Sequence, residues 1–141
     1  KINPDNKAGR LSFITRFGAS NIRTELPKLL REVGQEELRV TWICDPMHGN
    51  TRTATHGIKT RDLNDILSEV KQFIEVHVSE GTIPGGIHLE MTGSNVTECI
   101  GGLSEVTEDT LCERYLSKCD PRLNASQTIE LALNLVSWLT R

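Results

Sequence analysis

Residues 42–51 read Trp-Ile-Cys-Asp-Pro-Met-His-Gly-Asn-Thr, and the fold prediction starts from this stretch. A largely apolar run over residues 38–44 ends abruptly in a polar loop that carries one histidine, His48. A short apolar run of this length is typical of a buried β-strand. Loops that follow such strands often carry the side chains of a site, so His48 becomes the first candidate functional residue.

Two later stretches repeat this design. Residues 86–90 (Gly-Ile-His-Leu-Glu) end at Glu90, just before a Thr-Gly pair. Residues 115–120 (Tyr-Leu-Ser-Lys-Cys-Asp) end at Asp120, just before a proline. Three predicted strand ends therefore present His48, Glu90 and Asp120. An imidazole and two carboxylates suit a borderline divalent metal such as Mn, Fe, Co or Zn.

Helices and strands alternate along the chain. Apolar residues at helical spacing predict helices over residues 22–33, 61–79 and 125–140, the last with Ser126 as its N-cap. Short β-prone runs predict strands over residues 11–15, 38–44, 87–91 and 114–119. The long loop over residues 92–112 is predicted to be partly helical near residues 104–113.

This alternation predicts an α/β fold with parallel strands and right-handed crossovers. Polar strand ends that run into long loops are typical of the C-terminal face of a (β/α)₈ barrel, and about four βα units would make half of one. We expect residues 1–141 to form a single, incomplete domain, because a half barrel leaves two open sheet edges. A small flavodoxin-like open sheet is the competing architecture.

Arginines are the candidates for binding an anion. Arg16 follows the first predicted strand directly, and its fork of donors suits a phosphate or a carboxylate. A surface salt bridge is the alternative interpretation of the same residue. Arg52, Arg114 and Arg122 are weaker candidates, because exposed arginine is common. His56 and His77 are interpreted as surface or helix-packing residues.

Composition narrows the function classes. The chain has 141 residues and a net charge of -3, which argues against a surface that neutralises nucleic-acid phosphates. No apolar run approaches the roughly 20 residues that span a bilayer. The four cysteines form no CxxC pair, so we expect small, reduced, mostly buried side chains in a cytosolic protein. The first residue is a lysine, which suggests a processed or truncated chain.

Three motifs resemble one enzyme family. They are Asp-Pro-Met-His-Gly-Asn-Thr at residues 45–51, Gly-Ile-His-Leu-Glu-Met-Thr-Gly at residues 86–93, and Cys-Asp-Pro-Arg-Leu-Asn at residues 119–124. Residues 3–11 and 14–19 are also similar. The family is the class II (plant-like) 3-deoxy-D-arabino-heptulosonate 7-phosphate (DAHP) synthases, and the resemblance covers nearly the whole chain.

The resemblance implies the second half of a (β/α)₈ barrel. It implies condensation of phosphoenolpyruvate with erythrose 4-phosphate, the first step of the shikimate pathway to aromatic amino acids, with a divalent metal such as Mn or Co. By the same resemblance His48, Glu90 and Asp120 match three of four metal ligands. Arg16 matches an arginine that holds the phosphate of phosphoenolpyruvate. His48 and Asp120 border the substrates, and Arg16 and His48 count as catalytic.

The family's fourth metal ligand, a cysteine, and its catalytic lysine have no match here. We therefore expect the chain alone to be inactive and to need the N-terminal half of a barrel or a copy of itself, in a homo-oligomer. The alternative is a naturally short, non-catalytic homologue that binds a metal or a phosphorylated ligand, or that partners a full-length enzyme. We expect a cytoplasmic location, or a plastid in a plant, and neither nucleic acid nor membrane as a partner.

Overall fold

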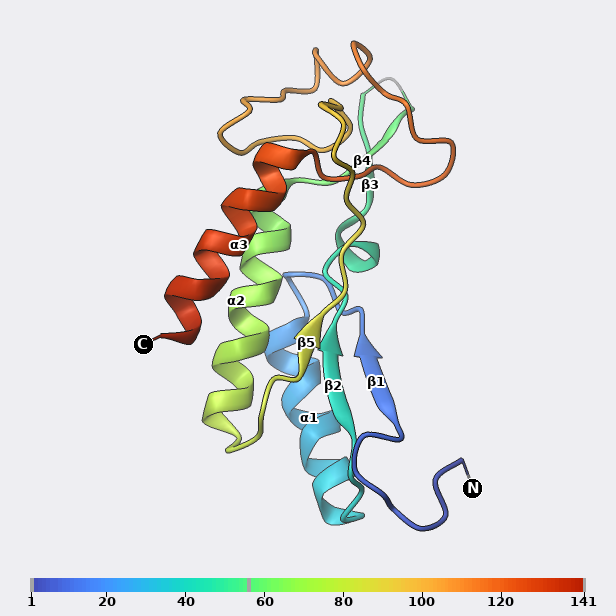
Figure 1. Cartoon of the computed structure of the whole chain (residues 1–141), viewed down its shortest axis with the longest axis vertical. Coiled ribbons are helices and arrows are strands. Elements are labelled where there is room, and N and C mark those ends of the chain that lie inside the picture. Colours follow the sequence, from blue (N-terminus) through green and yellow to red (C-terminus); the bar gives the residue numbers. More distant parts are fainter. Residues whose placement is uncertain (1, 56, 141) are drawn as a thin grey trace.

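The computed structural model of the chain describes residues 2–55 and 57–140. Its central sheet has three parallel strands, β1 (Ser12–Thr15), β2 (Thr41–Cys44) and β5 (Gly86–Ile87), in the order β1-β2-β5. Helices α1 (Ile22–Gln35) and α2 (Leu63–Ser79) connect these strands in turn, and α3 (Ala125–Leu139) packs beside α2 (Figure 1). The predicted α/β fold with parallel strands is confirmed.

The helices form where their apolar positions recur every three to four residues. In α1 the buried positions are Ile22, Leu26, Leu30 and Val33. Asp62 is the N-cap of helix α2, and its side chain accepts a hydrogen bond from the backbone N–H of Asn64. The predicted helices therefore exist, with ends shifted by a few residues.

The N-cap predicted for the last helix is wrong. Asn124, not Ser126, caps α3. The Asn124 side chain accepts from the backbone N–H of Gln127, and the Gln127 side chain accepts from the backbone N–H of Asn124. This reciprocal capping box satisfies two donors at once, which Ser126, two residues later, could not do, because Ile129 three residues beyond it has no side-chain acceptor.

The main core lies between the sheet and its helices. Trp42 and Cys44 of β2 face α1 and α2 and are buried with apolar side chains of both helices. Because side chains alternate along a strand, Thr41 and Ile43 point to the opposite face of the sheet, where they are only half-buried. The helices thus cover one face, as right-handed crossovers in one direction require.

The third predicted strand is shorter than expected. Backbone hydrogen bonds join Gly85 to Trp42 and His88 to Cys44, so pairing with β2 ends at His88. Beyond it, the extended chain at residues 90–92 pairs with Leu123, which donates to the carbonyl of Glu90 at 3.1 Å. The segment changes partner rather than continuing the sheet.

The fourth predicted strand, over residues 114–119, is absent, and so is the predicted helix near residues 104–113. Both regions consist of turns and irregular chain. The backbone N–H groups of Leu116 and Ser117, which a strand would give to a neighbouring strand, are donated instead to the carboxylate of Glu98. The resulting loop runs over the C-terminal end of the strands (Figure 1).

The loop predicted over residues 45–60 contains short elements of its own. These are the 3₁₀ turn η1 (His48–Asn50) and an antiparallel hairpin of β3 (Arg52–Thr53) and β4 (Lys59–Thr60). A small cluster of Ala54, Val106 and Leu111 anchors the hairpin against the loop over residues 92–124.

All four cysteines are free. Cys44 and Cys99 are buried, as predicted, whereas Cys112 and Cys119 are exposed, so that prediction is wrong for these two. Within the described ranges, the helices are too short or too polar to cross a membrane.

Candidate metal centre

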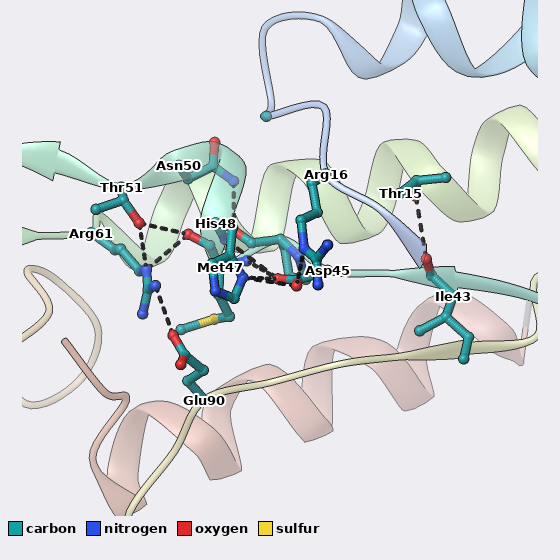
Figure 2. Close-up of polar contacts among 12 residues, drawn as sticks. Thr15, Arg16, Ile43, Asp45, Met47, His48, Asn50, Thr51, Arg61 and Glu90 are labelled. Atoms are coloured by element: carbon teal, nitrogen blue, oxygen red, sulfur yellow. Dashed lines mark hydrogen bonds and ion pairs between the residues drawn. The ribbon is translucent and has the colours of Figure 1, made fainter. Parts of the chain in front are cut away.

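Asp45 shapes the turn that presents His48. It is fully buried and is the first residue after β2. Its Oδ1 accepts from the backbone N–H groups of Met47 (3.1 Å) and His48 (3.3 Å), which reverses the chain. Nδ1 of His48 lies 2.8 Å from Oδ2 and 3.0 Å from Oδ1 of the same carboxylate (Figure 2). Nε2 is therefore the ring nitrogen left to bind a ligand.

Asp45 also holds Arg16. The Nε of Arg16 donates to Oδ2 of Asp45 at 2.7 Å, and half of the arginine side chain stays exposed. Burial raises the pKa of the Asp45 carboxyl, but hydrogen bonds from His48 and Arg16 outweigh it and hold this pKa below its ordinary value. The ionised carboxylate accepts a hydrogen bond from the N–H at Nδ1 of His48, which fixes the tautomer with a free Nε2.

The structure brings His48, Glu90 and Asp120 together. One possible ligand atom from each of the three lies within 4.8 Å of the others. Glu90 projects from the extended chain after β5, whereas Asp120 lies in the turn before Pro121. The strand expected to carry Asp120 is absent, yet a parallel bridge between Met91 and Leu123 still holds the two acidic segments side by side.

Glu98 holds the turn that carries Asp120. This fully buried carboxylate accepts from the backbone N–H groups of Leu116 (2.8 Å), Ser117 (2.7 Å) and Arg122 (2.8 Å). Burial raises the pKa of Glu98, but these donors outweigh it and keep the pKa below its usual value. An ionised carboxylate here replaces the strand pairing that would otherwise fix Asp120.

A cation stands beside each acidic member of the cluster. Nη2 of Arg61 lies 2.7 Å from Oε2 of Glu90, and Nζ of Lys59 lies 3.1 Å from Oδ1 of Asp120. Neither Nη2 of Arg61 nor Oε2 of Glu90 forms a well-aligned hydrogen bond. The ion pair between them is therefore the contact that offsets the cost of burying these two atoms. The hydrogen bond from Lys59 is the main cause that lowers the pKa of Asp120.

Glu69 joins the loop of Arg16 to the turn of His48. Its buried carboxylate accepts from the backbone N–H groups of Phe17 (3.2 Å) and Gly18 (3.0 Å), and from the side chain of Asn50 (2.7 Å). Burial raises the pKa of Glu69. The two loops touch through backbone atoms: a Cβ at Gly49 would lie 2.4 Å from the backbone nitrogen of Gly18.

The other residues singled out in the sequence lie elsewhere. Arg52 forms an ion pair with Glu108 at 2.7 Å. Arg114 and Arg122 are exposed, and His56 lies outside the described residues. His77 is fully buried against Phe73, with ring centroids 4.4 Å apart, so its interpretation as a helix-packing residue is confirmed.

Five residues of the site had no role assigned from the sequence: Asp45, which lies within a quoted motif, and Lys59, Arg61, Glu69 and Glu98. Glu69 had a signal, because it lies between Ile66 and Phe73 on the inward face of α2 and interrupts an apolar stripe with a charge. Glu98 lies outside regular periodic segments, and Arg61 stood in the first turn of the helix predicted over residues 61–79, where a charged residue looks exposed. Only the fold shows that both side chains are buried.

The chemistry of the cluster is that of a candidate metal site. It offers one imidazole nitrogen and two carboxylates, a donor set that suits borderline divalent ions. Asp45 supplies the acceptor that commonly orients a histidine ligand through its second nitrogen. The donors present thus fit a divalent ion.

Comparisons with known proteins agree on one family. The family model described as the class-II DAHP synthetase family matches residues 1–136. A protein of Streptomyces coelicolor named phospho-2-dehydro-3-deoxyheptonate aldolase is 54% identical over 132 residues, which are 94% of this chain and 29% of the relative. A protein of Mycolicibacterium smegmatis with the same activity in its name is 46% identical over 139 residues, 99% of this chain and 30% of the relative.

The chain thus spans about 30% of the length of these two relatives. The match runs through the segments that carry Arg16, His48, Glu90 and Asp120, which all lie within residues 1–136. The chain belongs to the class-II DAHP synthetase family.

Proposed function

We propose that this chain supplies the metal-binding part of a DAHP synthase. The reaction condenses phosphoenolpyruvate with erythrose 4-phosphate and water, releases inorganic phosphate, and opens the shikimate pathway to aromatic amino acids. The observation that carries the proposal is the approach of His48, Glu90 and Asp120 to within 4.8 Å, in a chain that belongs to this family. A cytoplasmic location belongs to the same proposal, because both substrates are charged phosphate esters.

The metal would be held by Nε2 of His48 and by one carboxylate oxygen each of Glu90 and Asp120. The buried Asp45 supports this assignment, since it occupies Nδ1 of His48 and leaves Nε2 free. When bound, a divalent ion such as Mn²⁺ or Co²⁺ would polarise the aldehyde oxygen of erythrose 4-phosphate. The other residues of the site would orient the two substrates.

Arg16 would hold the phosphate of phosphoenolpyruvate. Asp45 engages its Nε, which leaves the two terminal amino groups for a bidentate contact with an anion. His48, on the other side of Asp45, and Asp120 would border the same substrates. C3 of phosphoenolpyruvate then bonds to the aldehyde carbon, and water adds to C2. The aldehyde oxygen ends as a hydroxyl by taking a proton from that water, and phosphate leaves from C2, which becomes a ketone. Arg16 keeps the reacting carbons aligned during these steps.

We propose that the sheet is half of a (β/α)₈ barrel and that residues 1–141 form one incomplete domain with it. The face opposite the helices supports this. Ile14 of β1 and Ile43 of β2 are register partners on that face, and Ile14 is 44% exposed. Branched apolar side chains at such positions fill the interior of a barrel. Further strands would cover them.

The outer layer also has an uncovered apolar surface. A groove of about 450 Å³ runs between α2, β5 and α3, and apolar side chains of α3 stand exposed beside it. The exposed side chains are Ile129, Leu133, Val136 and Leu139. We propose that the βα units which the relatives carry in addition pack here. A copy of this chain, in a homo-oligomer, is the competing occupant.

Complementation tests the function. The chain would be mixed or co-expressed with the part of the Streptomyces coelicolor relative that the match does not cover, and phosphate release from the two substrates would be measured with Mn²⁺. We expect activity only when both parts are present, and loss of activity in His48→Ala and Asp120→Ala. Full activity in either variant, in a complex that forms normally, would overturn the assignment.

A non-catalytic role is the second candidate, and one observation favours it. The three candidate ligands all lie within this chain, so a metal could bind without the rest of a barrel. A folded complex that binds Mn²⁺ but releases no phosphate would support this binding role over the synthase.

A further inference from the structure

The two cations beside the metal cluster differ in how they are held. Arg61 is fully buried, and the side chain of its partner Glu90 is 20% exposed. Lys59 is 59% exposed at its side chain and contacts Asp120, which is 31% exposed. Each acidic candidate ligand therefore has a positive partner, one fixed inside the protein and one at the surface.

Arg61 contacts all three segments that carry candidate ligands. Its Nε donates to the carbonyl of Met47 at 2.8 Å and to Oγ1 of Thr51 at 3.0 Å, on either side of His48. Its Nη1 donates to the carbonyl of Pro121, next to Asp120. Its Nη2 pairs with Glu90 (Figure 2).

We propose that Arg61 is the positioning residue that assembles the metal site, and that Lys59 occupies Asp120 only until a metal displaces it. The proposal rests on the metal site of the proposed function and names two residues that act on it from outside. Arg61 sets the distances between the three ligand segments. Lys59 balances the charge of Asp120 while the ion is away.

Geometry and burial assign the two roles. The planar guanidinium of Arg61 presents donors in fixed directions to three separate segments, which an ammonium group cannot do. Removing this buried charge would also leave the carboxylate of Glu90 without its ion-pair partner. The Lys59–Asp120 pair is exposed and contributes little to stability, so an incoming divalent ion can replace the ammonium at small cost.

The two roles predict opposite changes in metal affinity. If Arg61 acted only as a positive charge, its removal would tighten metal binding by reducing repulsion. As a positioning residue, Arg61→Gln and Arg61→Lys should both weaken binding by about 10- to 100-fold, as lost outer-shell support does. Lys59→Gln should tighten metal binding about two- to fivefold, because the metal no longer has to displace Lys59 from Asp120. This factor corresponds to the free energy of one surface ion pair.

Mn²⁺ titration followed by electron paramagnetic resonance of the free ion tests this on the 141-residue chain. Circular dichroism of each variant verifies the fold, and Arg39→Gln, which removes an exposed arginine on β2's N-terminal side, is the control for net charge. Tighter binding by a folded Arg61→Gln variant, or unchanged binding by Arg61→Lys, overturns the role of Arg61. Unchanged or weaker binding by Lys59→Gln overturns that of Lys59.

A measurement on the unmodified chain covers the case in which Arg61 variants do not fold. Side-chain NMR with and without Zn²⁺ should show an Arg61 Nε–H that is protected from exchange in both states, and a Lys59 ammonium that is released when Zn²⁺ binds. Rapid exchange at Arg61, or a Lys59 that stays paired, would contradict the proposal. If the complemented chain binds the metal but does not condense the two substrates, the synthase function alone is overturned. If the chain does not bind the metal, both the synthase function and the roles of Arg61 and Lys59 are overturned.

Discussion

Nδ1 of His48 lies 2.8 Å from Oδ2 of Asp45, and this contact decides which ring nitrogen of the imidazole is free to bind a ligand. Asp45 is buried, ionised and also bonded to Arg16, so one carboxylate positions both the candidate metal ligand and the candidate phosphate-binding residue. The motif over residues 45–51 thus contains both the candidate ligand His48 and the residue that orients it, Asp45.

Replacing Asp45 tests this support. In Asp45→Asn the amide NH₂ group can donate to Nδ1 of His48, which moves the ring proton to Nε2 and blocks it as a ligand. We expect Mn²⁺ affinity to fall about 10- to 100-fold. Titration calorimetry measures the change, and Asp5→Asn, an exposed aspartate paired with Lys7, is the control. A folded Asp45→Asn chain with affinity within twofold of the original would disprove the orienting role.

Regular periodicity explains the parts of the fold that the sequence predicted. Leu26, Leu30 and Val33 recur at helical spacing and are buried in α1, and the apolar run before Asp45 contains β2. The segments that carry Glu90 and Asp120 were also predicted to be strands, yet the structure keeps only β5 (Gly86–Ile87) of them. Their positions are set by long-range partners, and no local pattern records such contacts.

Glu98 is the clearest example. Its carboxylate accepts hydrogen bonds from the backbone N–H groups of Leu116 and Ser117, so a segment with strand-like residues forms irregular chain instead of a strand. The buried charge is visible only after folding, because Glu98 has no periodic neighbours in the sequence. Arg61 was also missed, because a charged residue at the start of a predicted helix looks exposed, although Arg61 contacts every ligand segment.

The role of Glu98 gives the second prediction. In Glu98→Gln an amide nitrogen would replace one oxygen and face a backbone donor. Loss of one charge-assisted hydrogen bond costs about 1–2 kcal/mol, so amides in residues 114–122 should exchange about 5- to 30-fold faster with deuterium. Hydrogen exchange by mass spectrometry measures this, with the exposed Glu113→Gln as the matched control. Equal protection in both variants would refute the anchoring role.

The contact between Gly18 and Gly49 gives the third prediction. A Cβ at Gly49 would meet the nitrogen of Gly18 at 2.4 Å and its Cα at 2.9 Å, and neither backbone atom can move aside freely. We expect Gly49→Ala to lower the free energy of unfolding by about 1–3 kcal/mol, as overpacking does. The loop of Arg16 should separate from the turn of His48.

Urea unfolding measures the effect of Gly49→Ala. Gly34→Ala is the control, because a Cβ at this position in α1 meets nothing within 4 Å. Alanine should stabilise that helix by about 0.5–1 kcal/mol relative to glycine. If both substitutions change stability in the same direction, the close approach of the two loops is not a constraint on the fold.

His77 makes stability depend on pH. It is fully buried beside Phe73 and Trp42, and burial lowers its pKa from 6.5 to about 4. Below pH 6.5 the unfolded chain takes up a proton at this ring, whereas the folded chain does so only near pH 4. The free energy of unfolding should therefore be unaffected by His77 above about pH 7 and should fall as the pH drops from about 6.5 to 4.

Substitution by phenylalanine isolates this contribution. His77→Phe keeps a ring against Phe73 but has no titrating group, although it loses the 2.7 Å contact between Nδ1 and Oγ1 of Thr82. Between pH 7.5 and pH 5 the original chain should lose about 1–2 kcal/mol more stability than the variant in urea unfolding. Other titrating groups contribute to both proteins and cancel in the difference. Parallel pH profiles of the two proteins would mean that the imidazole is protonated, or hydrated, within the folded core.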